Sequence, residues 1–251
     1  MANRYITLGR GPHKVLALHG WFGSARSWEP LHAALNSEEF TYVFMDCRGY
    51  GEARALEGEY TMAEVARDAL ALADQLGLDK FSLMGHSMGG VAIQHLLLAA
   101  PQRVRKLVAI TPVPASGVPF DEPGWELFSS AAQSLMARKA IIDYSTGSRL
   151  SSAWVERMAR QSQQDSRAEA FGAYLNSWAR SDFANDVAGH PVPVQVLVGA
   201  HDPSLTAEVM AHTWLRSYPN AELAVLDNAG HYPVNETPVA LATRIEAFLR
   251  A

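Results

Sequence analysis

A serine between glycines stands where a short apolar segment changes into a helical one. In the hexapeptide GHSMGG, residues 85–90, Gly85 and Gly89 lie two residues before and two residues after Ser87. An apolar run at 81–84 precedes the hexapeptide, and a helical run at 91–100 follows it. This G-x-S-x-G pattern predicts a tight strand-to-helix turn that exposes the serine hydroxyl beside the free N–H groups of a helix N-terminus.

A serine hydroxyl attacks well only when a base takes its proton and an anion holds that base in one tautomer. His231 and Asp202 fit these roles, because each directly follows a predicted strand at the same edge of the sheet as Ser87. Asp202 can also be interpreted as the N-cap of the helix after it. Asp227 is the rival acid, but it lies only four residues before His231, so we expect it to end its strand.

Other polar residues near these positions have simpler interpretations. We expect His19, His86 and His201 to serve as structural or hydrogen-bonding groups rather than in proton transfer, and Asp46 to hold the turn after it. No two of the three histidines share a helix at i, i+4 spacing, so the sequence predicts no metal site. The single cysteine, Cys47, cannot form an internal disulfide and is expected to be a small buried residue.

Apolar runs alternate with helical ones along most of the chain. This alternation predicts an α/β fold with a mostly parallel, doubly wound sheet, in which ligands bind beyond the carboxyl ends of the strands. Thr61 and Glu64 form a capping-box pattern at the start of one helix. The predicted strands are 5–8, 14–18, 41–45, 81–84, 104–110, 194–198 and 222–226. The predicted core helices are 25–35, 61–76, 91–100, 205–215 and 236–249.

The segment 113–186 departs from this alternation. It has no long β-branched run, and helical patterns dominate at 125–140, 151–164 and 168–178. We therefore expect a core made of 1–112 and 187–251 and an inserted helical cap at 113–186 that lies over the site. Most aromatic residues of the cap should form its own core. Phe120, Trp125 and Phe128, near its start, are candidates to line a substrate pocket together with Phe22.

These motifs resemble the α/β-hydrolase superfamily, among its small bacterial esterase-like members with a cap. The matching segments, 19–21, 46–51, 85–90, 199–203 and 228–231, are spread over nearly the whole chain. The resemblance implies a triad of Ser87, Asp202 and His231. It also implies an oxyanion hole formed by the backbone N–H groups of Met88 and Trp21, with Phe22 as the less favoured second donor.

The resemblance implies a serine hydrolase that cleaves esters through an acyl-enzyme, as a carboxylesterase does, without a cofactor. Dehalogenases and epoxide hydrolases of the superfamily carry Asp at the nucleophile position of this strand-to-helix turn, so Ser87 argues against both. Lactonases and enol-lactonases, carbon–carbon bond hydrolases, and cofactor-free haloperoxidases or perhydrolases use a serine and stay open. A ligand-binding receptor with an idle triad is the alternative from a different class.

Composition limits the partners. The net charge of −5 argues against nucleic acid as a partner. No cluster of Lys or Arg indicates a site for a substrate that carries a phosphate or coenzyme A group. We therefore expect a small, fairly apolar ester or lactone as substrate. No apolar run approaches the roughly 20 residues that span a bilayer, and the N-terminus shows no signal-peptide pattern, so we expect a cytoplasmic protein without membrane contact. The sequence does not indicate the oligomeric state.

Overall fold

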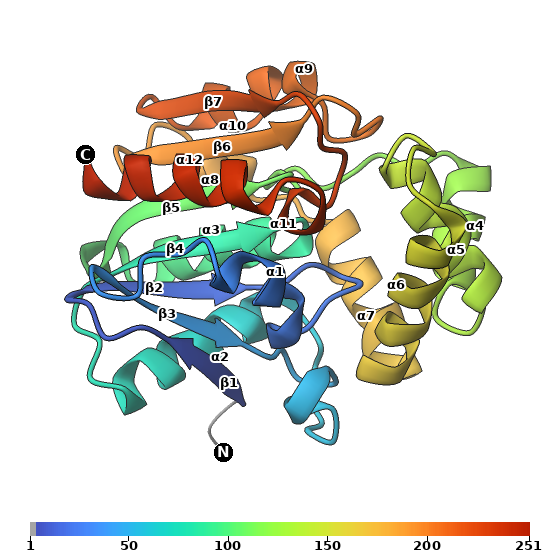
Figure 1. Ribbon diagram of the computed structural model, residues 1–251, viewed down its shortest axis with the longest axis horizontal. Coiled ribbons are helices and arrows are strands. Elements are labelled where there is room, and N and C mark those ends of the chain that lie inside the picture. Colours follow the sequence, from blue (N-terminus) through green and yellow to red (C-terminus); the bar gives the residue numbers. More distant parts are fainter. Residues whose placement is uncertain (1–3) are drawn as a thin grey trace.

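Seven strands form one sheet in the order β1-β3-β2-β4-β5-β6-β7 in the computed structural model, which describes residues 4–251 (Figure 1). β1 pairs antiparallel with β3, and every other pairing is parallel. Each predicted strand is confirmed to within two residues. The strands are β1 (Tyr5–Leu8), β2 (His13–Leu18), β3 (Phe40–Met45), β4 (Phe81–His86), β5 (Val104–Ile110), β6 (Val194–Gly199) and β7 (Ala221–Leu226).

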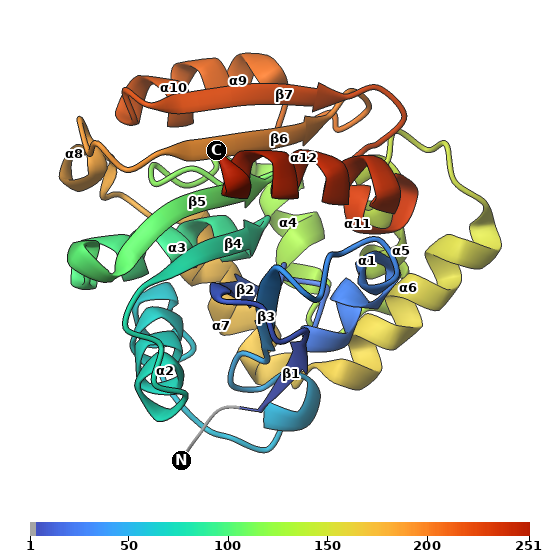
Figure 2. The same cartoon turned by 60° about the vertical axis from the view of Figure 1, so that its left-hand side comes forward.

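Helices cover both faces of the sheet, as the doubly wound prediction requires. Figures 1 and 2 show α1 (Glu29–His32) and α12 (Pro238–Arg250) on one face, and α2 (Met62–Gln75) and α3 (Met88–Ala99) on the other. Each face has its own apolar core, since Trp28 and Ile245 belong to one buried cluster and Leu72 and Ile93 to another. The fold is therefore α/β with a mostly parallel sheet.

Several predicted helices are divided or shortened, because prolines and capping side chains interrupt them. Pro238 has no N–H to donate, and a new helix starts there inside the predicted range 236–249. Ser134 accepts the N–H of Ala137 and starts a second helix inside the range 125–140. The further helices of the core are the 3-10 turns at Ala25–Trp28, Gly51–Ala53 and Pro101–Arg103, with α8 (Ala184–Val187), α9 (Ala207–His212), α10 (Trp214–Ser217) and α11 (Pro233–Glu236).

The capping pattern at the start of α2 forms with one change of partner. Thr61 accepts the N–H of Glu64, as predicted. The Glu64 carboxylate, however, accepts the N–H of Tyr60 and not that of Thr61. The predicted start of the helix is thus confirmed. The Glu64 carboxylate binds the backbone at Tyr60, one residue before the Thr61 N–H that a capping box would use.

A separate group of helices lies beyond the carboxyl ends of the strands (Figure 1). It consists of α4 (Glu122–Ser130), α5 (Leu135–Ser145), α6 (Ser152–Asp165) and α7 (Ala168–Ala179), and we call it the cap. The predicted cap, 113–186, also includes most of α8, which packs against α3 and α10. The boundary between core and cap stays a prediction. Residues 1–3 lie outside the described residues. They belong to the predicted core segment 1–112 and to the N-terminal stretch in which no signal-peptide pattern was found.

Candidate active site

Ser87 lies in a strained turn between β4 and α3. Its φ and ψ are 52° and −114°, a backbone conformation that few residues other than glycine adopt. The turn is held because the N–H of Ser87 donates to the carbonyl of Ile110 at 3.0 Å. A side chain at Gly85 would overlap the carbonyl of Gly89, and a side chain at Gly89 would overlap that of Leu18. The glycines at these positions are therefore required by close backbone approach.

The structure brings Ser87, His231 and Asp202 together. The Ser87 hydroxyl lies 2.9 Å from Nε2 of His231, and Nδ1 of His231 lies 2.6 Å from Oδ2 of Asp202. A carboxylate only accepts hydrogen bonds, so Nδ1 carries the ring proton and Nε2 is free to accept the serine proton. The three residues follow β4, β6 and β7, whose carboxyl ends meet at one edge of the sheet.

The two carboxylate oxygens of Asp202 have different partners, and the residue is not the N-cap of the following helix. Its Oδ1 accepts the N–H groups of Ser204 and Leu205 at 2.9 and 3.0 Å, while Oδ2 faces His231. It thus closes the turn after β6, although the N-cap of α9 is Thr206. Burial opposes its charge, but the His231 ring and the two N–H groups outweigh burial and lower the pKa of Asp202. The rival acid, Asp227, is exposed.

The loop that carries His231 is fixed from two sides. The N–H of His231 donates to the carbonyl of Ser145, in the last turn of cap helix α5, at 3.0 Å. The Glu236 carboxylate accepts the N–H groups of the residues before and after His231 and pairs with Arg149 at 2.9 Å. Sequence reasoning missed Glu236, because nothing in its spacing shows that its carboxylate turns back on the loop.

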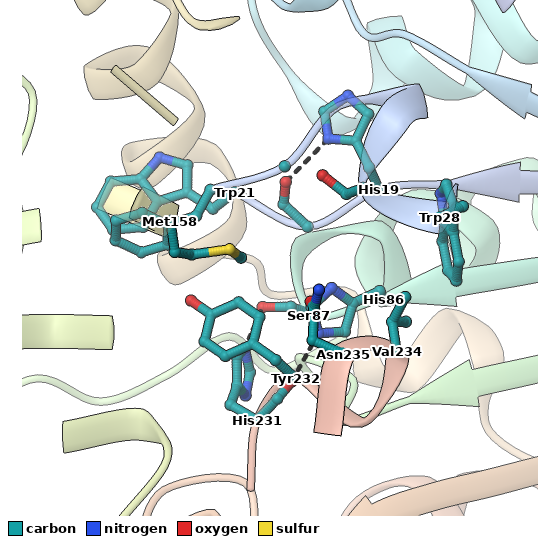
Figure 3. A pocket seen from close by; sticks show the side chains of 14 residues that line it. His19, Trp21, Trp28, His86, Ser87, Met158, His231, Tyr232, Val234 and Asn235 are labelled. Atoms are coloured by element: carbon teal, nitrogen blue, oxygen red, sulfur yellow. Dashed lines mark hydrogen bonds between the residues drawn. The ribbon is translucent and has the colours of Figure 1, made fainter. Parts of the chain in front are cut away.

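His86 donates a hydrogen bond to the loop that carries His231. Its Nε2–H donates to the carbonyl of His231 at 2.7 Å (Figure 3). The Thr111 hydroxyl donates to the same oxygen at 3.1 Å. Burial and the neighbouring His231 ring lower the pKa of His86 to about 3. His86 is therefore a neutral hydrogen-bond donor, in agreement with the role expected from the sequence.

His19 orients the peptide between Gly20 and Trp21. Its Nδ1–H donates to the carbonyl of Gly20 at 2.8 Å (Figure 3). Its Nε2 accepts the N–H of Cys47 at 3.1 Å. The N–H of Gly23 donates to the same carbonyl at 2.9 Å. In a trans peptide the C=O and the N–H point in opposite directions, so fixing this carbonyl directs the N–H of Trp21 away from His19.

The backbone donors expected around Ser87 are free to bind a ligand. Met88 is the first residue of α3, and within residues 4–251 no acceptor takes its N–H or that of Trp21. The N–H of Phe22 has no acceptor in this range either, so both candidates for the second donor stay open. The helix N-terminus at Met88 adds partial positive charge at this point.

The side chain of Trp21 is anchored in the cap. Its indole ring stacks between Phe171 and Phe128, with ring centroids 4.0 and 5.7 Å apart, and its Nε1–H donates to the Phe171 carbonyl at 2.8 Å. The guanidinium of buried Arg138 lies 3.7 Å from the other face of the Phe171 ring. The residue that carries a candidate oxyanion donor is therefore packed against Phe171 and Phe128 of the cap, and Arg138 covers the Phe171 ring.

Two cavities meet at Ser87 and His231. The cap-side cavity encloses about 550 Å³ including its opening. Its walls include Trp21, Phe22, Ser87, Trp178, Asp202, His231 and Tyr232. The rest of its lining is mostly apolar: Val113, Val118, Phe120, Phe128, Ile141 and Leu205. Figure 3 shows the second, loop-side cavity, which His19, Trp28, His86, Met158 and Asn235 help to line.

Three of the four candidate pocket residues lie at the cap-side cavity, and one does not. Phe22, Phe120 and Phe128 line it. Trp125 lies outside the lining: it packs edge-on against Phe120, at 6.0 Å between ring centroids, and the Arg180 guanidinium covers its ring at 4.4 Å. The structure thus assigns Trp125 to the packing of the cap and not to the cavity wall.

Residues 4–251 lack two features that would indicate another kind of site. No cluster of three or more His, Cys, Asp or Glu side chains is placed to hold a metal ion. No helix in this part of the chain is both long and apolar enough to cross a membrane.

The sequence and the fold of the chain are similar to those of known hydrolases. A family described as "alpha/beta hydrolase fold" matches residues 14–238. A pimeloyl-[acyl-carrier protein] methyl ester esterase of Pectobacterium carotovorum is 25% identical, over 98% of this chain and 97% of its own. A 2-hydroxy-6-oxononadienedioate/2-hydroxy-6-oxononatrienedioate hydrolase of Dechloromonas aromatica is 27% identical, over 91% and 83%. The structure of a thermophilic esterase from Thermogutta terrifontis superposes with a TM-score of 0.84 at 24% identity, over 98% and 92%.

Proposed function

The chain belongs to the alpha/beta hydrolase family, and from this premise we propose that it is a serine hydrolase that cleaves small, fairly apolar carboxylic esters. One observation carries the proposal: a single imidazole lies 2.9 Å from the Ser87 hydroxyl and 2.6 Å from the Asp202 carboxylate. This arrangement removes a proton from an alcohol and stabilises the resulting imidazolium, as nucleophilic catalysis by serine requires.

The proposed reaction has two halves. In the first, Ser87 attacks the ester carbonyl while Nε2 of His231 takes its proton, and His231 then protonates the leaving alcohol. In the second, His231 takes a proton from water as the water oxygen attacks the acyl carbon; the bond to Ser87 then breaks, the acid leaves, and His231 returns the proton to the Ser87 oxygen. We place the negative oxygen of each tetrahedral intermediate against the N–H groups of Met88 and Trp21, which lack other acceptors in the described chain.

The lining of the cap-side cavity supports an apolar substrate. Its walls carry aliphatic and aromatic side chains, and among the described residues no Lys or Arg lines it. Pockets of this kind bind ligands through apolar contact and use a few polar groups to orient them. The relative from Pectobacterium, which is named for methyl ester cleavage, supports an ester as the bond that is broken.

A carbon–carbon bond hydrolase is the second candidate, because the relative from Dechloromonas is named for hydrolysis of an oxo-dienedioate. The enol-lactonase, the haloperoxidase or perhydrolase and the idle-triad receptor have no observation of this chain that favours them. A panel of acyclic esters, lactones and vinylogous diketones separates the hydrolase chemistries. The first two compare open-chain with cyclic esters, and the diketones report cleavage of a carbon–carbon bond.

Turnover of p-nitrophenyl acetate and butyrate by wild type and Ser87→Ala tests the proposal. We expect Ser87→Ala to lower kcat/KM by about 10⁴-fold or more, because the nucleophile is lost. The matched control is Ser129→Ala, an exposed serine on α4, which should stay within about twofold of wild type. Full esterase activity in Ser87→Ala would show that the mechanism is wrong.

A further inference from the structure

An open groove adjoins the cap-side cavity. It encloses about 1200 Å³ including its opening, and it is lined by residues of the segment 114–121, of α4, of the end of α5, and of α9 with the loop before it. Ser87 lines the cavity but not the groove, so the groove lies farther from the nucleophile. Five residues line both spaces and therefore form their common boundary: Val118, Phe120, Phe128, Ser204 and Leu205.

A row of aromatic rings leads from the site of chemistry to this boundary. The ring centroids of Trp21 and Phe128 are 5.7 Å apart, and those of Phe128 and Phe120 are 4.5 Å apart. Trp21 lines the cavity at Ser87, whereas the two phenylalanines line both the cavity and the groove. One apolar wall therefore continues from the catalytic serine into the groove.

The backbone on both sides of the boundary is held by hydrogen bonds. On the core side, the N–H of Leu205 donates at 3.0 Å to Oδ1 of Asp202, whose other carboxylate oxygen holds His231. On the cap side, the N–H of Val118 donates at 3.0 Å to the carbonyl of Ala179, the last residue of α7. A ligand that crosses the boundary therefore does not have to order these segments first, which lowers the cost of binding.

The groove is apolar although it is open to solvent. Leu127 and Tyr144, which line it, are among the large hydrophobic side chains that the described chain exposes, at 36% and 53%. Within the described residues, the one charged side chain of its lining is Asp121, and this carboxylate accepts the N–H of Gly124 at the start of α4. Exposed apolar surface of this kind beside a catalytic site indicates a groove for an apolar ligand.

The space beyond the loop-side cavity has the opposite character. A second groove, lined by α6 and residues 24–30, shares Ser27, Met158 and Asn235 with that cavity. Its lining includes four charged side chains: Arg26, Glu29, Arg157 and Asp165. Once the alcohol has left, water must take its place at the acyl carbon while the acyl half stays bound to Ser87. The polar route suits the alcohol and the incoming water, and the apolar route suits the acyl half.

We propose that the acyl chain of the ester runs from Ser87 through the cap-side cavity, across the boundary at Phe120 and Leu205, and into the apolar groove. This inference rests on the proposed ester hydrolysis. Within the small, apolar esters of that proposal, it specifies unbranched acyl chains that are long enough to reach the groove, in preference to acetate and butyrate. The groove then determines chain-length specificity, because each methylene group that enters it leaves water.

The dependence of hydrolysis on chain length tests the proposal. kcat/KM is measured for p-nitrophenyl esters from acetate to decanoate, below the concentrations at which the longer esters form micelles. We expect kcat/KM to rise beyond butyrate, by up to about fourfold for each CH₂ group that the groove buries. A second series, from ethyl to octyl acetate, lengthens only the alcohol half.

Two variants place a charge in the groove. Leu127→Glu and Tyr144→Glu alter residues that line the groove but not the cavity at Ser87. An alkyl chain beside the new carboxylate would strip it of water, so each variant should lower the octanoate-to-acetate ratio of kcat/KM about tenfold. The ratio of octyl to ethyl acetate should stay as in wild type.

Met136→Glu is the matched control. It introduces the same charge on the cap, at a residue that is 69% exposed and lines neither the cavity nor the groove. Both ratios should equal those of wild type. A control that lowers the octanoate-to-acetate ratio as much as the groove variants do would overturn the inference, because the loss would then come from charge on the cap in general.

Three further results would overturn the inference. They are a wild-type profile that does not rise beyond butyrate, a rise that is equal in wild type and both groove variants, and an effect of these variants on the alkyl acetates alone. The last result would place the alcohol half in the groove.

Calorimetric titration of Ser87→Ala with N-methyloctanamide and N-methylbutanamide measures the same preference without turnover. If esters are not hydrolysed but the longer amide binds more tightly and Leu127→Glu removes the difference, the proposed function fails and the assignment of the groove stands. If esters are hydrolysed and neither the profile nor the affinity responds to the groove variants, only the assignment of the groove fails.

Discussion

The carboxyl edge of the sheet and the wall of the cap-side cavity both adjoin Ser87, but their polar groups differ in whether they have hydrogen-bond partners. At the edge, His231, Asp202 and His86 each have a partner within 3 Å. Beneath the cap, Tyr232 and Trp178 have none among the described residues. The comparison teaches that hydrogen bonds hold the side chains at the strand ends in place, whereas the packing of buried rings holds those of the cap-side wall.

The two regions are also positioned by different forces. Strand ends and the strained turn at Ser87 fix the sheet edge through backbone hydrogen bonds. Aromatic stacking around Trp21 fixes the cap-side wall. Substitutions at the edge should therefore act mainly on the rate of chemistry, and substitutions in the cap on alignment and selectivity.

Among variants that keep Ser87, Asp202→Asn should lower kcat the most. An amide side chain can present its N–H to His231 and favour the wrong tautomer, so we expect kcat to fall by about 10⁴-fold. The exposed Asp227→Asn is the control and should change kcat by less than about twofold. An equal loss in both variants would show that Asp202 is not the orienting acid.

Phe171→Ala tests whether the cap aligns the core loop. Losing the ring that stacks on Trp21 should let its backbone N–H move, and we expect kcat to fall about 10- to 100-fold with a smaller change in KM. Trp125→Ala, also a cap aromatic but outside the cavity wall, should change kcat by about twofold at most. An equal loss in both variants would indicate general damage to the cap, and unfolding temperatures identify that case.

The buried histidines of the sheet edge predict how stability depends on pH. The pKa of His86 falls from 6.5 to about 3 on folding, mainly through burial, and burial also lowers that of His19. Between these values the unfolded chain binds more protons, so the free energy of unfolding should decrease as pH falls below 6.5. His86→Gln should make this slope shallower by up to one proton, about 1.4 kcal/mol per pH unit.

Denaturant unfolding of wild type and His86→Gln at pH 7, 5.5 and 4.5 measures that slope. Glutamine is the suitable replacement because its side-chain N–H can still donate to the carbonyl of His231. Two parallel stability curves would show that His86 does not remain neutral in the folded protein.

The carboxyl edge of the sheet was largely predictable from sequence, because buried parallel strands are continuous apolar runs and Ser87, Asp202 and His231 follow three of them. The cap was less predictable. Trp125 and Phe128 are three residues apart on α4, and only the packing against α7 decides which of them reaches the cavity. Breaks such as the one at Ser134 depend on a single hydrogen bond.

The unpaired donors could not be found from sequence at all. Tyrosine and tryptophan are ordinary core residues, and a buried Tyr174 looks the same in the sequence as Tyr232. Whether a donor lacks a partner depends on neighbours that are distant in the chain. Glu236 was missed for the same reason.

Acylation of Ser87 is the most direct test of the central claim. The protein is mixed with excess p-nitrophenyl butyrate, quenched in acid during turnover, and analysed by mass spectrometry of the intact chain and its peptides. We predict one butyryl group, on the peptide that contains Ser87, which disappears when the substrate is exhausted. Steady turnover with that peptide unmodified, or with the butyryl group on another residue, would contradict the account.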